Sequence, residues 1–344
     1  ASVNNITRNV IREINQHYGL QLKLNQHNEF ELFGVIVCCL GTDDLGRFSG
    51  AVGMTSFGLY LNEASVAKEE VFDELLKRCS GDKDFAPMVI IDTNPDSPEH
   101  YLYKNYISIP FDDRKKKGIL TFHWELDDNP FLNPQVRENL KNSTPSGVFY
   151  DRKIKGLWVT ADGIVYEDFD KSIHVIDDSQ AYSKNEFVRF YAGVDWGYEH
   201  KGVIVLVGVT SDDLHIILRV IAARHMLISW WVEQAQEIIR LYGYGIKFYC
   251  DSARPDNINE FRKANIWAVE ANKTINAGVE CVAGKWKKRN LYILRSQSAE
   301  FLSEIYAYVW DKKTGLPVKV NDDIMDAIRY GVFTDSEAHK IKKR

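Results

Sequence analysis

The sequence predicts an α/β protein with two domains, and three observations lead to this prediction. Short apolar runs typical of buried strands alternate with amphipathic stretches typical of helices. Several of the apolar runs end in an acidic residue followed by small or turn-forming residues, which places one carboxylate at a strand end. The length of 344 residues is enough for two domains, each with its own core.

The composition is that of an ordinary globular protein, with 45% hydrophobic and 26% charged residues. No run of eighteen apolar residues occurs, so we expect no membrane span, and the N-terminus lacks the apolar core of a signal peptide. The five scattered cysteines form no CxxC zinc pattern and fit a reducing cytoplasm. A net charge of −5 argues against a surface coated in basic residues but permits a local nucleic-acid groove.

In the first half, two predicted strands lead to polar residues. The stretch Phe57–Ser65, FGLYLNEAS, presents Glu63 directly after an apolar run. A nucleotide hydrolase presents the acid that polarises its attacking water in this way, whereas the alternative is an exposed carboxylate before an N-capped helix. The strand Met88–Ile91 then leads into a rigid turn at Asp92–Pro98, DTNPDSP. Upstream, Glu31–Leu40 is predicted to be one strand buried on both faces.

The Gly41–Gly50 loop has glycine spacing similar to that of a phosphate-binding loop. We reject this interpretation, because Arg47 replaces the expected Lys and two aspartates would face the phosphates.

In the second half, a strand through Phe190–Gly197, FYAGVDWG, delivers Asp195 to its end. The elements that follow are the strands Gly202–Val209 and Leu214–Ile221, the helix Ser229–Tyr242 and the strand Ile246–Cys250. The last of these strands delivers Asp251 in the same way. Three antiparallel strands, a helix and a parallel strand form the order of an RNase H-like fold. Because the first and fourth strands are neighbours in that fold, Asp195 and Asp251 are expected to face one site.

A final helix, Asn321–Phe333, is predicted to begin with an Asn cap. Asp323 and Asp326 are three positions apart and share one face of its first turn. Compensation of the helix dipole is the simpler explanation for either acid alone. Clustered carboxylates repel one another unless cations lie among them, and hard oxygen donors suit Mg²⁺ or Mn²⁺.

Together these motifs resemble the large terminase subunit, the DNA-packaging motor of tailed bacteriophages. NEAS and TNP resemble the Walker B and coupling motifs of its ATPase domain, and TFHWELDDNPFLNP at Thr121–Pro134 continues the likeness. GVDWG, CDSARP and NDDIMDAIRY resemble its nuclease domain, in the same order. The resemblance implies an incomplete P-loop-type ATPase domain without a Walker A motif, followed by an RNase H-like nuclease domain with a mixed sheet flanked by helices.

The sequence departs from the family pattern at two places. Asn62 stands where the family usually has an Asp before the catalytic Glu, which weakens direct support of Mg²⁺. No Gly-rich P-loop with Lys occurs upstream, and the chain lacks an initiator Met. We therefore expect a chain that begins inside the ATPase domain, with ATP bound only by the complete protein.

The resemblance also implies a role for individual residues. Glu63 matches the catalytic acid of the ATPase, and Thr93 and Asn94 match its coupling motif. The acids that match catalytic metal ligands of the nuclease are Asp195, Asp251 and Asp326, with Asp323 at a position where members carry Asp or His. Two Mg²⁺ or Mn²⁺ ions about 3.5–4 Å apart would activate water and stabilise the leaving 3′-oxygen, with Asp195 as the bridging ligand.

The expected organisation is a partial ATPase domain (1–150), a linker (151–185), a nuclease domain (186–335) and a basic tail (336–344). The run KWKKR is expected to contact DNA phosphates through Lys285, Lys287, Lys288 and Arg289, with Trp286 available to stack on a base or ribose.

The implied partners are double-stranded phage DNA, the portal protein and the small terminase subunit, with a homo-oligomeric ring on the portal and no membrane. The implied location is the host cell cytoplasm, with transient docking on the procapsid. Two alternatives stay open: another RNase H-like nuclease of the resolvase or transposase type, and a non-catalytic packaging module in which the acids hold a structural ion.

Overall fold

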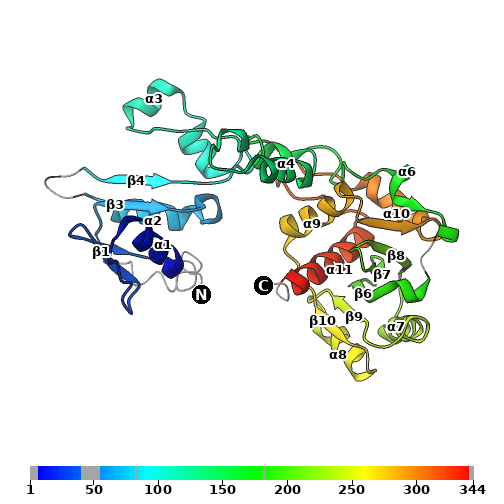
Figure 1. Ribbon diagram of the computed structural model, residues 1–344. Coiled ribbons are helices and arrows are strands. Elements are labelled where there is room, and N and C mark those ends of the chain that lie inside the picture. The colour runs from blue at the N-terminus through cyan, green and yellow to red at the C-terminus, as the bar shows by residue number, and fades with distance from the viewer. Residues whose placement is uncertain (1–6, 40–54, 82–83, 85, 181–182, 341–344) are drawn as a thin grey trace. The chain divides into compact units, whose positions relative to one another are not determined.

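The computed structural model describes residues 7–39, 55–81, 84, 86–180 and 183–340 (Figure 1). The chain divides into two compact units, Ala1–Asn94 and Pro95–Arg344. The predicted domain boundaries at residues 150 and 185 stay predictions. The Gly41–Gly50 loop lies outside the described residues. In the described ranges, none of the helices combines the length and the apolar character needed to cross a membrane.

The first unit is built around two parallel strands and a helix. Its elements are α1 (Arg8–Tyr18), β1 (Glu29–Leu32), β2 (Val35–Cys38), β3 (Gly58–Leu61), the short 3₁₀ helix η3 (Ala64–Val66), α2 (Glu69–Arg78) and β4 (Met88–Ile91). Strands β3 and β4 pair in parallel, with Leu61 beside Ile91, so the polar residues that follow both strands lie at the same edge. Helix α2 buries Val71 and Phe72.

The prediction of one buried strand over Glu31–Leu40 is wrong. A hairpin of β1 and β2 is found instead, with Leu32 paired to Val35. Phe33 and Gly34 form its turn with φ of 51° and 81°, and the glycine takes the left-handed conformation without steric cost. Neither strand is fully buried, because both keep partly exposed positions along their length.

The second unit contains a seven-stranded mixed sheet with helices on both faces (Figure 1). Its strands are β5 (Val175–Ile176), β6 (Phe187–Asp195), β7 (Gly202–Thr210), β8 (His215–Ala223), β9 (Lys247–Cys250), β10 (Ala268–Glu270) and β11 (Leu291–Leu294). Its helices are α3 (Phe111–Lys116), α4 (Pro134–Ser143), α5 (Val148–Lys153), α6 (Lys171–His174), α7 (Ile228–Tyr242), α8 (Pro255–Lys263), α9 (Ile275–Lys287), α10 (Ser298–Ala307) and α11 (Asp323–Lys340).

The strand order is β10-β9-β6-β7-β8-β11-β5. Strands β6, β7 and β8 are antiparallel neighbours, and β9 joins the free side of β6 in parallel. This is the order expected for an RNase H-like fold, and the prediction that the first and fourth strands are neighbours is confirmed.

Strand β7 runs through the middle of the unit and is buried at every position. Its side chains alternate between two cores, as the two-residue period of a strand requires. Val203, Val205 and Val207 belong to the core beneath α9, α10 and α11, whereas Ile204 and Leu206 belong to the core beneath α7 and α8. Each such side chain stabilises the fold by about 1.5–3 kcal/mol on full burial.

The segment predicted as a linker contributes to the first of these cores. Val165, Tyr166 and Phe169 are buried in it, and β5 forms the edge strand beside β11. The predicted basic tail begins within α11, and residues 341–344 lie outside the described ranges.

Candidate active site

Asp195 and Asp251 lie side by side at one edge of the sheet. Asp195 is the last residue of β6, and Asp251 directly follows β9. The parallel register pairs Val194 with Cys250, and the Asp251 amide donates a hydrogen bond of 2.9 Å to the Val194 carbonyl. Two strands that end at the same level therefore bring together carboxylates that are far apart in the sequence.

Helix α11 brings two more acids to this edge because its backbone touches that of β6. A Cβ atom on Gly193 would lie 1.9 Å from the carbonyl oxygen of Ala327, and one on Gly331 would lie 3.0 Å from the Gly193 amide nitrogen. Only glycine permits this approach. The first turn of the helix, with Asp323 and Asp326, is thereby held near the end of β6.

The helix begins at Asp323 rather than at an Asn cap. Asn321 has a φ of 52°, and the amide of Asp326 donates to the carbonyl of Asp322 at 2.8 Å. The predicted cap is therefore wrong by one residue, and the predicted face shared by Asp323 and Asp326 is retained.

Electrostatic repulsion is concentrated on Asp195. Its burial and the nearby charges of Asp326, Asp251 and Asp323 raise its pKa well above the usual value for an aspartate. Burial and the neighbouring Asp322 also raise the pKa of Asp323. Within the described residues, the Asp195 carboxylate has neither an ion pair nor a hydrogen bond to compensate its charge.

The other two acids are paired with cations that the sequence analysis missed. Asp326 contacts Lys319 Nζ at 2.6 Å and Arg329 Nη2 at 2.8 Å, and the Tyr330 hydroxyl donates to it at 3.3 Å. Asp251 contacts Lys273 Nζ at 2.5 Å. Arg329 is one helical turn after Asp326, so spacing alone would have indicated that pair. Lys273 and Lys319 reach the acids from loops, and no pattern in the sequence indicates such contacts.

The donor set suits a hard divalent cation, although the side chains are arranged around ammonium groups. Among the residues that the structure describes, no group of three or more His, Cys, Asp or Glu side chains is close enough to hold a metal ion. All four acids offer carboxylate oxygens, which Mg²⁺ and Mn²⁺ prefer. Asp195, with no partner and with acids around it, is the position where an added cation would relieve the most repulsion.

Glu304 of α10 holds the first turn of α11 in place, and sequence reasoning did not identify it. Its side chain is only 2% exposed. One carboxylate oxygen accepts a hydrogen bond of 2.8 Å from the Ile324 amide, and the other lies 2.7 Å from Lys201 Nζ. An unpaired amide of the first helical turn is thus satisfied by a buried side chain. Lys201, in the turn after β6, links the same carboxylate to the strand that carries Asp195.

In the first unit, the predicted ATPase residues lie together. Glu63 follows β3, and its two carboxylate oxygens each accept a hydrogen bond of 3.1 Å from the Asn94 side chain. The Thr93 hydroxyl accepts from the Ser65 amide at 3.0 Å. Glu63 has a φ of 53°, a conformation that is rare and strained for a residue with a side chain.

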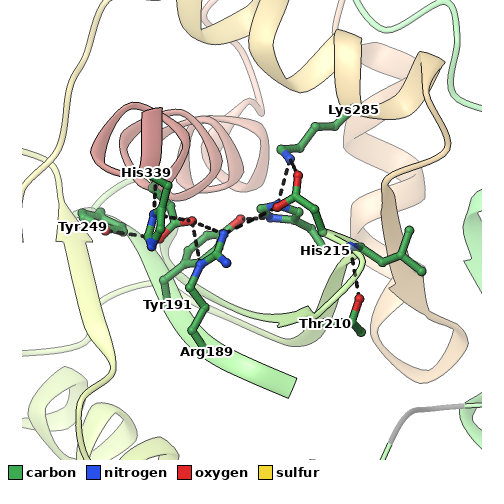
Figure 2. Close-up of polar contacts among 10 residues, drawn as sticks. Arg189, Tyr191, Thr210, His215, Tyr249, Lys285 and His339 are labelled. Carbon is green, nitrogen blue, oxygen red and sulfur yellow. Dashed lines mark hydrogen bonds and ion pairs between the residues drawn. The ribbon is translucent and has the colours of Figure 1, made fainter. Parts of the chain in front are cut away.

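The predicted DNA contacts of the KWKKR run divide into two groups. Figure 2 shows Lys285 directed at His215, with Nζ 2.8 Å from Nε2, and the same ammonium lies 3.5 Å from Asp213 Oδ2. Burial lowers the pKa of Lys285. Trp286 is fully buried, so the stacking interpretation is wrong. Lys287 contacts Ser146 and Asp168, whereas Lys288 and Arg289 are exposed beyond the end of α9.

Lys285 is therefore paired within the network drawn in Figure 2, with 13% of its side chain exposed. In that network the Tyr191 hydroxyl lies 2.8 Å from His215 Nδ1, and Arg189 contacts Asp335 at 3.0 Å. The phosphate contact of Lys285 stays a prediction.

The comparisons with known proteins agree with this architecture. The family model for the T4-like-virus type of terminase large subunit, N-terminal part, matches residues 7–172. A crystal structure of the large terminase from a thermophilic bacteriophage has a TM-score of 0.81 and 24% identity, covering 97% of this chain and 84% of the phage protein. The same phage protein in complex with ADP and with ATP-γ-S gives TM-scores of 0.78 and 0.77, at 24% identity. These complexes cover 97% of this chain and 84% and 83% of theirs.

No curated protein sequence matches the chain. The structural likeness, at this level of identity, shows a shared fold, and the family model adds the sequence relationship across residues 7–172. Residues 7–172 therefore belong to the large terminase family by sequence, and the chain as a whole shares the fold of a phage large terminase.

Proposed function

We propose that this protein cleaves double-stranded phage DNA by metal-dependent hydrolysis of phosphodiester bonds at the site of Asp195, Asp251, Asp323 and Asp326. The observation that carries the proposal is the carboxylate of Asp195, which has no ion pair or hydrogen bond among the described residues and lies among three other acids at the end of β6. A fold built only for stability gains nothing from a partly buried charge without a partner. A site that binds a divalent cation does require such a carboxylate, because the cation becomes its partner.

The four acids would hold Mg²⁺ or Mn²⁺, with Asp195 at the centre. When bound, such ions supply an activated water and stabilise the leaving 3′-oxygen. The chain itself contributes position: the paired ends of β6 and β9 fix Asp195 and Asp251, and the contact of Gly193 with Ala327 fixes the helix that carries Asp326.

The direct experiment is incubation of the purified chain with supercoiled plasmid DNA. We expect nicked and linear products with Mg²⁺ or Mn²⁺ and no cleavage with EDTA. A preference for branched DNA, or strand transfer, would favour a resolvase or transposase type of nuclease instead. Bound metal without cleavage would favour a non-catalytic packaging module.

DNA phosphates are proposed to contact Lys288 and Arg289, with Lys287 held nearby by Ser146 and Asp168. The double variant Lys288→Ala/Arg289→Ala should weaken DNA binding at all sequences. It should also reduce the dependence of log K on log salt by about one unit per cation removed. A salt titration of binding to a short duplex measures this, with exposed Lys312→Ala as the control. An unchanged slope would remove these cations from the interface.

For the complete protein we propose ATP hydrolysis in which Glu63 polarises the attacking water and Asn94, hydrogen bonded to it, couples hydrolysis to movement. The relative from the thermophilic phage has been solved with ADP and with ATP-γ-S. A Glu63→Gln variant of the complete protein should lose ATPase activity, and retained activity would exclude this role.

The proposed partners are the portal protein, the small terminase subunit and phage DNA, in the host cytoplasm. A homo-oligomeric ring on the portal is part of the same proposal. Cosedimentation of the complete protein with procapsids tests it, and failure to cosediment under packaging conditions would count against it.

A further inference from the structure

Lys319 occupies the solvent side of two buried carboxylates. Its ammonium lies 2.6 Å from Asp326 Oδ2 and 3.1 Å from Asp322 Oδ2. The Lys319 side chain is 56% exposed, whereas that of Asp326 is 7% exposed. The lysine precedes α11 in an irregular segment, so its aliphatic stem can change rotamer without moving a helix or a strand.

The second oxygen of Asp326 has a different kind of partner. Arg329 Nη2 contacts Oδ1 at 2.8 Å, and the arginine side chain is almost fully buried. The same guanidinium donates to the Lys273 carbonyl at 3.1 Å and cannot leave without breaking that bond. Oδ1 is therefore committed to a structural contact. Oδ2 also accepts a hydrogen bond of 3.3 Å from the Tyr330 hydroxyl, and it is the oxygen whose cation can be exchanged.

Asp251 also has a lysine partner, but both of its contacts are made by one oxygen. The amide of Ala253 donates to its Oδ1 at 3.0 Å, and the partly exposed Lys273 ammonium approaches that oxygen from a loop. Two of the acids around Asp195 thus each have one backbone or arginine contact and one lysine that reaches in from solvent.

We propose that Lys319 is an exchangeable internal cation, which neutralises Asp326 in the metal-free protein and is displaced by the divalent ion when it binds. The inference rests on the metal site of the proposed function and adds a regulation of that site. Arg329 stays on Oδ1, but removing the cation at Oδ2 would still be costly at a buried carboxylate, and the exchange avoids this cost because one cation replaces another. The ammonium must be released for Asp326 Oδ2 to become a ligand, so lysine and metal compete for one oxygen.

Competition between Lys319 and the divalent ion predicts how the affinity for Mn²⁺ changes, and this affinity can be measured without DNA and without cleavage. In the full chain, Lys319→Gln should bind Mn²⁺ about five- to tenfold more tightly than the natural sequence, which corresponds to the loss of one competing ion pair. Lys319→Arg keeps the cation and should bind Mn²⁺ no more tightly than the natural protein. Lys312→Gln, which removes a lysine paired with Asp162 at the surface, is the matched control and should change nothing. Calorimetric titration with Mn²⁺ measures all four proteins.

The displacement itself can be followed by amine labelling and mass spectrometry. Lys319 should become more reactive as Mn²⁺ is added, with a midpoint at the calorimetric Kd, while Lys312 stays constant. Unchanged or weaker Mn²⁺ binding by Lys319→Gln, or Lys319 labelling that does not respond to Mn²⁺, would overturn the inference and leave the proposed nuclease intact. If the natural chain binds no Mn²⁺, the metal site fails, and the inference fails with it.

Discussion

Asp195→Asn is expected to reduce metal-dependent plasmid cleavage by about a thousandfold or more. Asp195 would hold the ions that stabilise the transition state, and losing such stabilisation lowers the rate by about a thousandfold or more. Asparagine keeps the shape and one oxygen but removes the charge at the centre of the acid cluster. The measurement is the initial rate of supercoiled DNA loss at saturating Mn²⁺.

The fold of this variant should be unharmed, which separates loss of chemistry from loss of structure. Asp195 has no side-chain partner among the described residues, and its substitution relieves repulsion with Asp326 and Asp251. The metal-free melting temperature of Asp195→Asn should therefore equal or exceed that of the natural protein. Asp256→Asn, which removes a surface carboxylate paired with Arg254 at 2.9 Å, is the control and should cleave normally. Normal cleavage by Asp195→Asn would refute the proposed site.

Glu304→Ala is expected to lower the free energy of unfolding by about 2–4 kcal/mol. The substitution leaves the Ile324 amide without its acceptor and removes the closer partner of Lys201, which is itself only 19% exposed. Glu304→Gln can still accept from the amide and should lose less. Urea denaturation measures the free energy, and hydrogen exchange at Ile324 reports on the first turn of α11.

Glu300 provides a control for this prediction on the same helix. It also contacts Lys201, at 3.3 Å, but its side chain is 61% exposed. Because exposed ion pairs contribute little, Glu300→Ala should change stability by less than about 0.5 kcal/mol. Equal effects of the two substitutions would show that Glu304 does not hold the helix.

The core of the site could be predicted because it depends on strand ends. The apolar runs before Asp195 and Asp251 are buried strands, and their parallel pairing follows from the order of elements. Helical spacing also placed Asp323 and Asp326 on one turn. Strand ends and helical spacing depend on the local sequence, and strand pairing depends on the order of elements, so the sequence pattern predicts all three.

The cations around the acids could not be predicted, because they depend on contacts between distant loops. Nothing in the sequence distinguishes these cations from other surface lysines. Only the fold places Lys319, Lys273 and Lys201 each beside a carboxylate. The same limit applies to Glu304, whose spacing in α10 gives no indication of its contact with Ile324.

The wrong prediction that Trp286 of the KWKKR run stacks on DNA could have been avoided from the sequence. Val279, Val282, Ala283 and Trp286 follow the three- and four-residue spacing of one helical face, and all four are buried. The residues of the run were predicted to share one DNA-binding surface, although successive residues of a helix point in different directions. Lys288 and Arg289 are exposed because the helix has already ended at Lys287.

The glycine contact between β6 and α11 has a consequence for how the proposed cleavage can be restrained during packaging. The two backbones touch with no side chain between them, so no layer of side chains can repack to let the helix slide or rotate over the sheet. The backbone positions that carry Asp195 and the first turn of α11 are therefore fixed during folding, and only the side chains have to exchange their partners when an ion arrives. Restraint of the nuclease must then act on what enters the site, either DNA or cation, because separating the helix from the sheet would require unfolding this part of the protein.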